Sequence, residues 1–172
     1  MRAASPEDLA VTILINSRVG AAAFKAVQDL GGELDLTSLP AVPLQEASED
    51  GRQTLAELIA QVASWPEFAA SVATKILHKK RPDLIPILDN EAIFGAYMNP
   101  RWPEQRASQE SVYAVGWIRE ALDWIHHDLS RQENENAWRS LHTEYVTRTR
   151  IDLFDMAWWV YFRRIQPVAR PL

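Results

Sequence analysis

The chain has 172 residues and a formal net charge of −5, and 47% of its residues are hydrophobic while 24% are charged. A domain of this size buries roughly 70% of its unfolded surface, so it can form a core without disulfides or structural metals. There is no cysteine, which excludes a disulfide scaffold, a thiol nucleophile and thiolate metal sites. The longest run without a charged residue, 36–45, is too short to cross a bilayer, so we expect no membrane association. Because Glu7 and Asp8 stand where a signal peptide would begin its apolar stretch, we expect a cytoplasmic protein.

The N-terminal third predicts helices separated by one long loop. Residues 5–8, Ser-Pro-Glu-Asp, have the composition of a helix start, and a second helix over 21–30 should end at the glycine pair 31–32. An acidic, proline-containing loop is expected over 31–52. Its leucines should hold it to the core: Leu34, Leu36, Leu39 and Leu44.

The middle of the chain predicts three shorter helices. A helix over 53–65 has one apolar face, made by Leu55, Leu58, Ile59 and Val62. The next helix should start at Pro66 and end before Pro82, followed by an extended apolar connector over 85–88. Asp89 or Asn90 should then cap a short helix that runs through Tyr97.

Two long helices are expected in the C-terminal half. The helix over 108–131, capped by Ser108, has apolar residues spaced by three and four: Val112, Val115, Ile118, Leu122, Ile125 and Leu129. A helix around 138–145 follows, and the helix over 150–165 is apolar nearly all round. We therefore predict a single all-α domain, 1–172, of about seven or eight helices with 108–131 and 150–165 at its centre. Residues 166–172 are expected to be a flexible tail.

Two basic segments interrupt this acidic chain. Residues 75–81 carry four cations without an acid, and residues 146–172 carry five arginines and two aspartates. Solvated cations at helix C-termini explain such segments. The alternative for 75–81 is a local anion-binding face, because the acidic net charge argues only against a broad nucleic-acid footprint.

The common catalytic and cofactor motifs are missing from the sequence. Its six glycines form neither GxGxxG nor a P-loop, and GxSxG and HExxH are absent. His126 and His127 are adjacent, so on a helix they point about 100° apart and cannot chelate one metal together. Asp123 and His127 have the spacing of a helical pair, and His78 is expected on a helix surface. We predict no metal site and no cofactor.

The segment 65–97 carries the most specific pattern. It reads as a helix with a basic end, a proline-flanked apolar connector, an aspartate and another helix. The run KRPDLIPILD from Lys80 to Asp89, with Asp-Leu-Ala at 8–10, resembles an uncharacterised bacterial all-helical domain family of unknown function. A late helix fits that family more loosely, through Arg150, Asp152, Asp155, Trp158 and Arg163. The same segment distantly resembles the core of helix-hairpin-helix DNA glycosylases, which implies a core of that type and places their catalytic aspartate on Asp89.

The chain departs from the glycosylases at the hairpin. Their hairpin uses glycines so that backbone N–H groups can approach a phosphate at a helix N-terminus. Residues 66–70 contain no glycine and include Glu67, which would repel a phosphate. Ser71 stands where the bifunctional enzymes have a lysine, so the resemblance implies no lyase chemistry.

Asp89 has a structural and a catalytic interpretation. As a helix N-cap it would stabilise the fold by about 1 kcal/mol. It could instead pair with Lys75 or with an arginine of the C-terminal helix. A catalytic role needs a partner base, which the sequence does not reveal.

The last helix predicts a structural polar network. Arg148 and Asp152 are four residues apart and can pair. Asp155 lies among apolar residues and must find a cation or hydrogen-bond donors, for which the candidates are Arg150, Arg163 and the basic cluster. We predict a buried salt bridge there.

Two functions of different classes are compatible with these observations. The preferred one is a non-catalytic binding module that contacts nucleic acid weakly, or a protein, through Lys75, Lys79, Lys80 and Arg81. The alternative is a glycosylase-like hydrolase that acts on a nucleobase or nucleoside with Asp89. A ligand-sized cavity touching Asp89 favours the enzyme, whereas a buried Asp89 bonded to backbone N–H groups favours the module.

Overall fold

The computed structural model describes residues 21–30, 34–98 and 114–165 of the chain. Within these ranges there are six α-helices, one π-helix and two short 3-10 helices, and no β-strand. The predicted all-α class is therefore confirmed. The predicted helix start at 5–8, Ser108 and the tail 166–172 lie outside the described residues. Among the helices that are described, none combines the length and the hydropathy needed to cross a bilayer.

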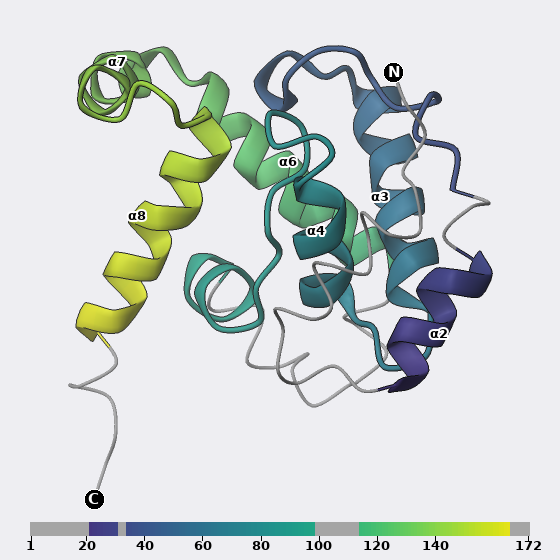
Figure 1. Cartoon of the computed structure of the whole chain (residues 1–172). Helices are drawn as coiled ribbons and strands as arrows, with labels where there is room; N and C mark the ends of the chain where they lie inside the picture. The colour runs from purple at the N-terminus through teal and green to yellow at the C-terminus, as the bar shows by residue number, and fades with distance from the viewer. Residues whose placement is uncertain (1–20, 31–33, 99–113, 166–172) are drawn as a thin grey trace, which may run out of the picture.

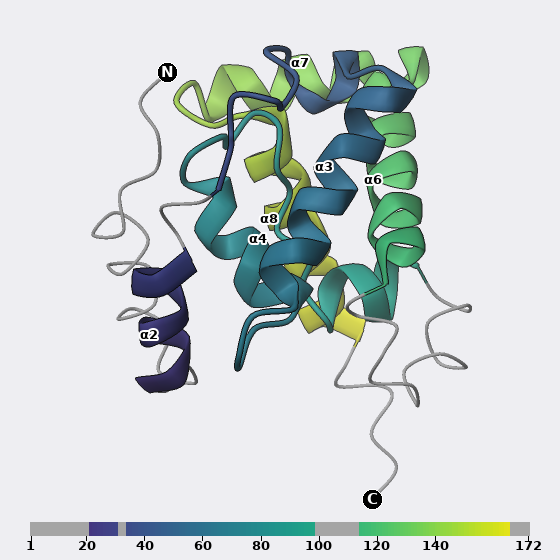
Figure 2. The same ribbon diagram turned by 90° about the vertical axis from the view of Figure 1, so that its right-hand side faces the viewer.

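Three helices form the body of the molecule: α3 (Glu49–Ala63), α4 (Ala70–His78) and α6 (Val115–Ser130). α3 packs against both α4 and α6, and Figure 2 shows the three helices together. The apolar face predicted for α3 is buried in this packing. The stripe of α6 is buried as well, at Ile118, Leu122, Ile125 and Leu129. These two faces form most of the centre of the core.

The N-terminal ends of the three body helices differ from the predictions. α3 begins at Glu49 instead of Gln53, because the Ser48 side chain accepts a hydrogen bond from the Gly51 N–H (3.2 Å) and caps the helix. α4 begins at Ala70 instead of Pro66, because a turn precedes it in which Glu67 has a φ of 64°. α6 begins at Val115, after an extended Ala114, instead of at 108.

The leucine-containing loop lies on the body as predicted. Only one helical turn, η2 (Leu44–Glu46), interrupts residues 34–48. All four leucines of the loop are buried. The guanidinium of Arg81 donates to the carbonyl oxygen of Pro40 (2.8 Å), so the polar part of the loop is also held in place.

A buried connector leads from α4 to the π-helix η3 (Ala92–Tyr97). Residues 85–89 have no regular structure, and Ile85 and Leu88 are fully buried. In η3 the hydrogen bonds span five residues, as between the Phe94 N–H and the Asp89 carbonyl (3.0 Å). The predicted short helix through Tyr97 is present, in π rather than α geometry.

The remaining helices lie at the periphery. α2 (Ala21–Leu30) and α8 (Arg150–Ile165) lie on opposite sides of the body in Figure 1, and α7 (Glu135–Glu144) lies beside the N-terminal end of α8. We call α7 and α8 together the lobe. α8 has the predicted bounds, but its predicted central position is wrong. It packs against η3, α6 and α7 on part of its surface, while Met156, Val160 and Tyr161 are 41%, 51% and 51% exposed.

Candidate functional site

Asp89 lies at the junction of α4, the 85–89 connector and η3. Its side chain is buried, and Oδ1 accepts hydrogen bonds from the backbone N–H groups of Glu91 (2.7 Å) and Ala92 (3.0 Å). The N–H of Leu88 donates to the Thr74 hydroxyl (3.0 Å), which ties the connector to α4. Glu91 directly precedes η3, and Asp89 accepts the free N–H groups of this first turn in the way that a capping side chain does, as its structural interpretation requires.

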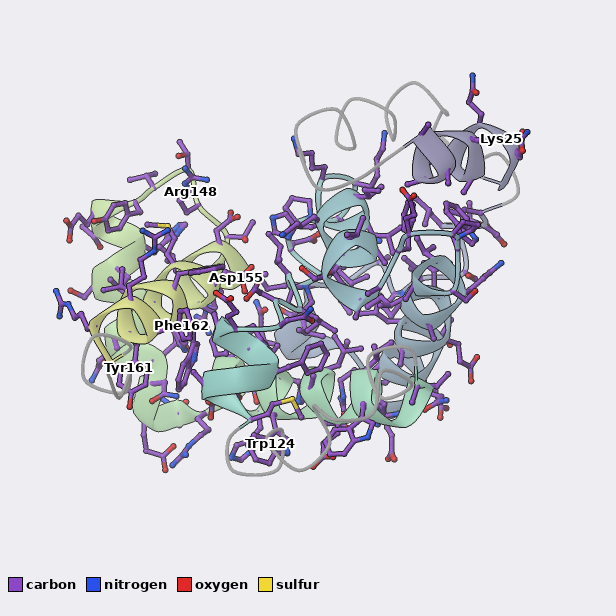
Figure 3. All side chains as sticks on the ribbon, turned by 90° about the horizontal axis from the view of Figure 1, so that it is seen from below. Lys25, Trp124, Arg148, Asp155, Tyr161 and Phe162 are labelled. Carbon is purple, nitrogen blue, oxygen red and sulfur yellow. The ribbon has the colours of Figure 1, made fainter. Side chains whose placement is uncertain are left out.

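Asp155 reaches the same connector from α8. Figure 3 shows it where α8 meets the rest of the molecule. Its Oδ2 accepts from the Ile87 N–H (3.2 Å), and its buried Oδ1 has no hydrogen-bond partner. Burial raises the pKa of Asp155 to about 8, the Ile87 hydrogen bond opposes that rise, and the negative charges of Asp152 and Asp89 add to it. Its carboxyl is therefore largely protonated near neutral pH.

His78 bridges the connector and α8. Its Nδ1 lies 2.6 Å from the carbonyl oxygen of Ile85, and its Nε2 lies 3.3 Å from Oδ1 of Asp152. A carbonyl oxygen only accepts hydrogen bonds, so the proton of a neutral imidazole must lie on Nδ1. The expectation that His78 is a surface residue is wrong, because α8 covers it.

The predicted polar network in the last helix does not form. Asp152 accepts from the Thr149 N–H (2.9 Å) and faces His78, whereas the predicted partner was Arg148. Arg150 pairs with Glu135 (2.8 Å), and Arg163 lies over the ring of Trp159 at 5.9 Å. No cation is therefore bonded to Asp155 among the described residues, and the predicted buried salt bridge is wrong.

The pair predicted within α6, Asp123 with His127, does not form either. Asp123 accepts from Arg119 (2.9 Å) and from Arg52 of α3 (2.5 Å), so its partners are two arginines rather than His127. Burial by itself would raise the pKa of Asp123, but the hydrogen bonds from Arg52 and Arg119 lower it below its usual range. In the part of the chain that is described, no group of three or more His, Asp or Glu residues is arranged to hold a metal ion.

The four cations of the basic segment differ in exposure. Lys79 is exposed, while Lys75 and Lys80 are half-buried. Arg81 is buried, and it bonds the Pro40 carbonyl and lies 3.4 Å from Asp83. The structure thus places Arg81 in a structural contact and leaves Lys79 as the most exposed cation of the segment. Binding of nucleic acid by these residues stays a prediction.

An apolar groove of about 360 Å³ lies between α7 and α8. α7 lines it with Leu141, and Tyr145, the residue that follows α7, lines it as well. The exposed side of α8 supplies the other wall: Met156, Ala157, Val160, Tyr161 and Arg164. Asp89 does not line this groove, so the groove belongs to a surface separate from the Asp89 junction.

A family model matches residues 2–161 of the chain. The chain belongs to DUF6308, a family of unknown function. The matched residues include the Asp89 junction and all of the groove except Arg164. Neither a curated protein nor a solved structure matches the chain. The resemblance to an uncharacterised family is confirmed, and the likeness to the glycosylase core stays a prediction.

Two features of this DUF6308 chain escaped the sequence analysis. His78 gave only a weak signal, because a histidine near the basic end of a helix is usually solvated. The exposed side of α8 gave the opposite signal, because apolar residues on every face usually indicate a buried helix. The short link at 145–149 makes α7 and α8 neighbours along the chain, but it gives no signal for which side of α8 stays exposed.

Proposed function

We propose that this chain is a non-catalytic helical module that binds another protein through the α7–α8 groove. The observation that carries the proposal is the apolar side of α8, with Met156, Val160 and Tyr161 each more than two-fifths exposed. A monomeric domain usually buries side chains of this kind, and a contiguous exposed patch of them marks an interaction surface.

The lining of the groove fits a protein better than a small molecule. Small-molecule sites are deep and combine apolar walls with a few convergent polar groups. This groove is open along α8, and among the residues that the structure describes Arg164 is the only charged one that lines it. Flexible methionine and large aromatic tyrosine side chains are typical of surfaces that pack against another polypeptide.

Photo-cross-linking in cells that make the protein tests this proposal. A benzoylphenylalanine at Val160 should give one discrete protein adduct, because this side chain lies in the groove. The matched control is the same amino acid at Glu57, an exposed position on α3 of the body. A discrete adduct from position 160 alone is the expected result. The same adducts from both positions, or none from position 160, would contradict a binding role for the groove.

A glycosylase-like hydrolase remains the second candidate function. The observation in its favour is that Asp89 lies close enough to Asp155 for its negative charge to help raise the pKa of the buried Asp155 carboxyl, because a carboxyl kept protonated near neutral pH can act as a general acid. The capping bonds of Asp89 favour the structural role instead. Two results together would establish the enzyme. The protein should release free base from oligonucleotides or nucleosides, and Asp89→Asn should abolish this release without changing the melting temperature.

The nucleic-acid hypothesis for 75–81 has a direct test. With so few exposed cations, binding should be weak and should fade as salt rises, because each phosphate contact contributes a slope of about −0.9 in log affinity against log salt. Fluorescence anisotropy with short oligonucleotides at low and physiological salt, repeated with Lys79→Glu, measures this. Binding that survives physiological salt would show that the segment is a stronger interface than its exposure suggests.

A further inference from the structure

The α8 side of the groove is long enough to contact a helix of a partner. Its α8 wall extends from Leu153 to Arg164, about 16 Å at a rise of 1.5 Å per residue. This length matches about three turns of a second helix laid alongside. Along the wall, Met156 and Val160 are four residues apart, as are Ala157 and Tyr161, so the exposed apolar surface is continuous from turn to turn. Grooves between helices commonly accept the apolar face of an amphipathic helix.

The polar surroundings of the groove are basic. Arg164 lines one end, and Arg148 lies in the turn that joins α7 to α8 (Figure 3). Neither forms an ion pair within the described part of the chain, and both are exposed. Arg163, also exposed, lies over the Trp159 ring. Glu144 is the one exposed acid at the C-terminal end of α7. Around the groove, unpaired positive charge therefore exceeds negative charge, in a chain whose net charge is −5.

From this shape and charge we infer that the partner presents an acidic amphipathic helix of about three turns, with its apolar face in the α7–α8 groove and its carboxylates toward Arg148 and Arg164. The inference rests on the proposed function and names the class of partner for it. Complementary charge of this kind selects the partner and its orientation, while the apolar contacts supply most of the affinity.

Two other occupants fit the surface less well. In a symmetric dimer the same patch meets itself, so the arginines of one copy would approach those of the other. A lipid surface fits the convex face of a single amphipathic helix, whereas this surface is a groove between two helices. Both become outcomes of the test.

Synthetic peptides test the inference with the full chain. The probe is a fluorescein-labelled helical peptide of about 14 residues, with leucines spaced by three and four and glutamates elsewhere. The matched control peptide has lysine at every glutamate position. At low salt we expect the acidic peptide to bind at least about tenfold more tightly than the basic one in an anisotropy titration, with the difference falling as salt rises.

Variants assign the binding to the groove. Val160→Asp should weaken the binding of the acidic peptide at least about tenfold, because it places a carboxylate in the apolar contact. Arg164→Glu should weaken the binding of the acidic peptide and strengthen the binding of the basic one. Lys25→Glu, an equal charge change on α2, should alter neither. Circular dichroism of each variant checks that the helices remain folded, which is expected because all three side chains are exposed.

Several results would overturn the inference. They are equal binding of the two peptides, tighter binding of the basic peptide, and binding that Val160→Asp leaves unchanged. A concentration-dependent dimer abolished by Val160→Asp would identify a second copy as the occupant, and binding to phosphatidylglycerol vesicles abolished by that variant would identify a lipid surface. If cross-linking at position 160 gives a discrete adduct but the acidic peptide is not preferred, the inference of an acidic helical partner is wrong and the proposal of protein binding stands. Absence of both would overturn the two proposals together.

Discussion

The body of α3, α4 and α6 and the lobe of α7 and α8 use apolar side chains differently. In the body each helix has one apolar stripe, a second helix covers that stripe, and polar side chains on the other face pair with each other, as Asp123 does with Arg52 and Arg119. In the lobe, α8 has apolar residues on all sides but neighbours on only some of them. The apolar content of a helix therefore does not determine how deeply it is buried, because burial also requires enough chain to surround the helix.

The largest expected effect is in the body. Leu122 of α6 is fully buried, so Leu122→Ala should remove apolar contacts and leave a cavity. We expect a loss of about 2–5 kcal/mol in the free energy of unfolding, measured by urea denaturation. A loss below about 1 kcal/mol would indicate that the body repacks easily, and the contrast between the two regions would then disappear.

The next effect concerns the contact between the lobe and the body. The pKa of Asp155 is raised from 3.8 to about 8, so the unfolded chain releases this proton at a lower pH than the folded chain does. The contribution of Asp155 to stability is fully present below about pH 4 and is lost progressively as the pH rises to about 8, at up to about 1.4 kcal/mol per pH unit. Asp155→Asn cannot ionise, so it should have little effect at pH 3 and should stabilise the protein progressively more as the pH rises from 4 to 8.

Denaturation of the unmodified protein and of Asp155→Asn between pH 3 and pH 8 checks the sign of this pH dependence. His78, Asp152 and Asp89 also face this junction, so the comparison with Asp155→Asn isolates the contribution of one carboxyl. An unchanged pH profile in the variant would mean that Asp155 is already ionised and paired in the folded protein.

A smaller effect is expected at Asp89. Asp89→Ala removes the acceptor for two backbone N–H groups at the start of η3, and we expect a loss of about 1 kcal/mol. Asp89→Asn keeps an acceptor oxygen and should recover most of that loss. If Asp89→Ala leaves the melting temperature unchanged, the capping role is contradicted and the catalytic interpretation gains support, because catalytic carboxylates often cost stability.

The smallest effect is expected on the exposed side of the lobe. Val160→Ala should change the free energy of unfolding by less than about 0.5 kcal/mol, because half of this side chain is in solvent. Thermal denaturation of Val160→Ala and Leu122→Ala in parallel compares the stability losses of the two variants. A loss comparable to that of Leu122→Ala would show that α8 is covered in solution, as in a dimer that buries the groove.

Local patterns in the sequence were enough to predict the all-α class, the bounds of α2 and α8, and the buried stripes of α3 and α6. They also predicted that the leucines of the 34–48 loop would be buried. These features depend on residue spacing, on capping residues and on glycine or proline at helix ends, and all of these act within a few residues. The late starts of α4 and α6 were missed because backbone choices such as the positive φ of Glu67 leave little trace in composition.

The candidate sites depend on residues far apart in the chain. His78 meets Asp152 across 74 residues, and Ile87 meets Asp155 across 68. The spacing within each helix predicted other partners, Arg148 for Asp152 and arginines for Asp155, because sequence spacing describes only one helix at a time. Which side of α8 faces η3, and therefore which side remains open as a groove, is decided by the packing of the whole chain. The sequence by itself determined the helices and their apolar faces, and only the tertiary structure decided which of those faces stayed uncovered.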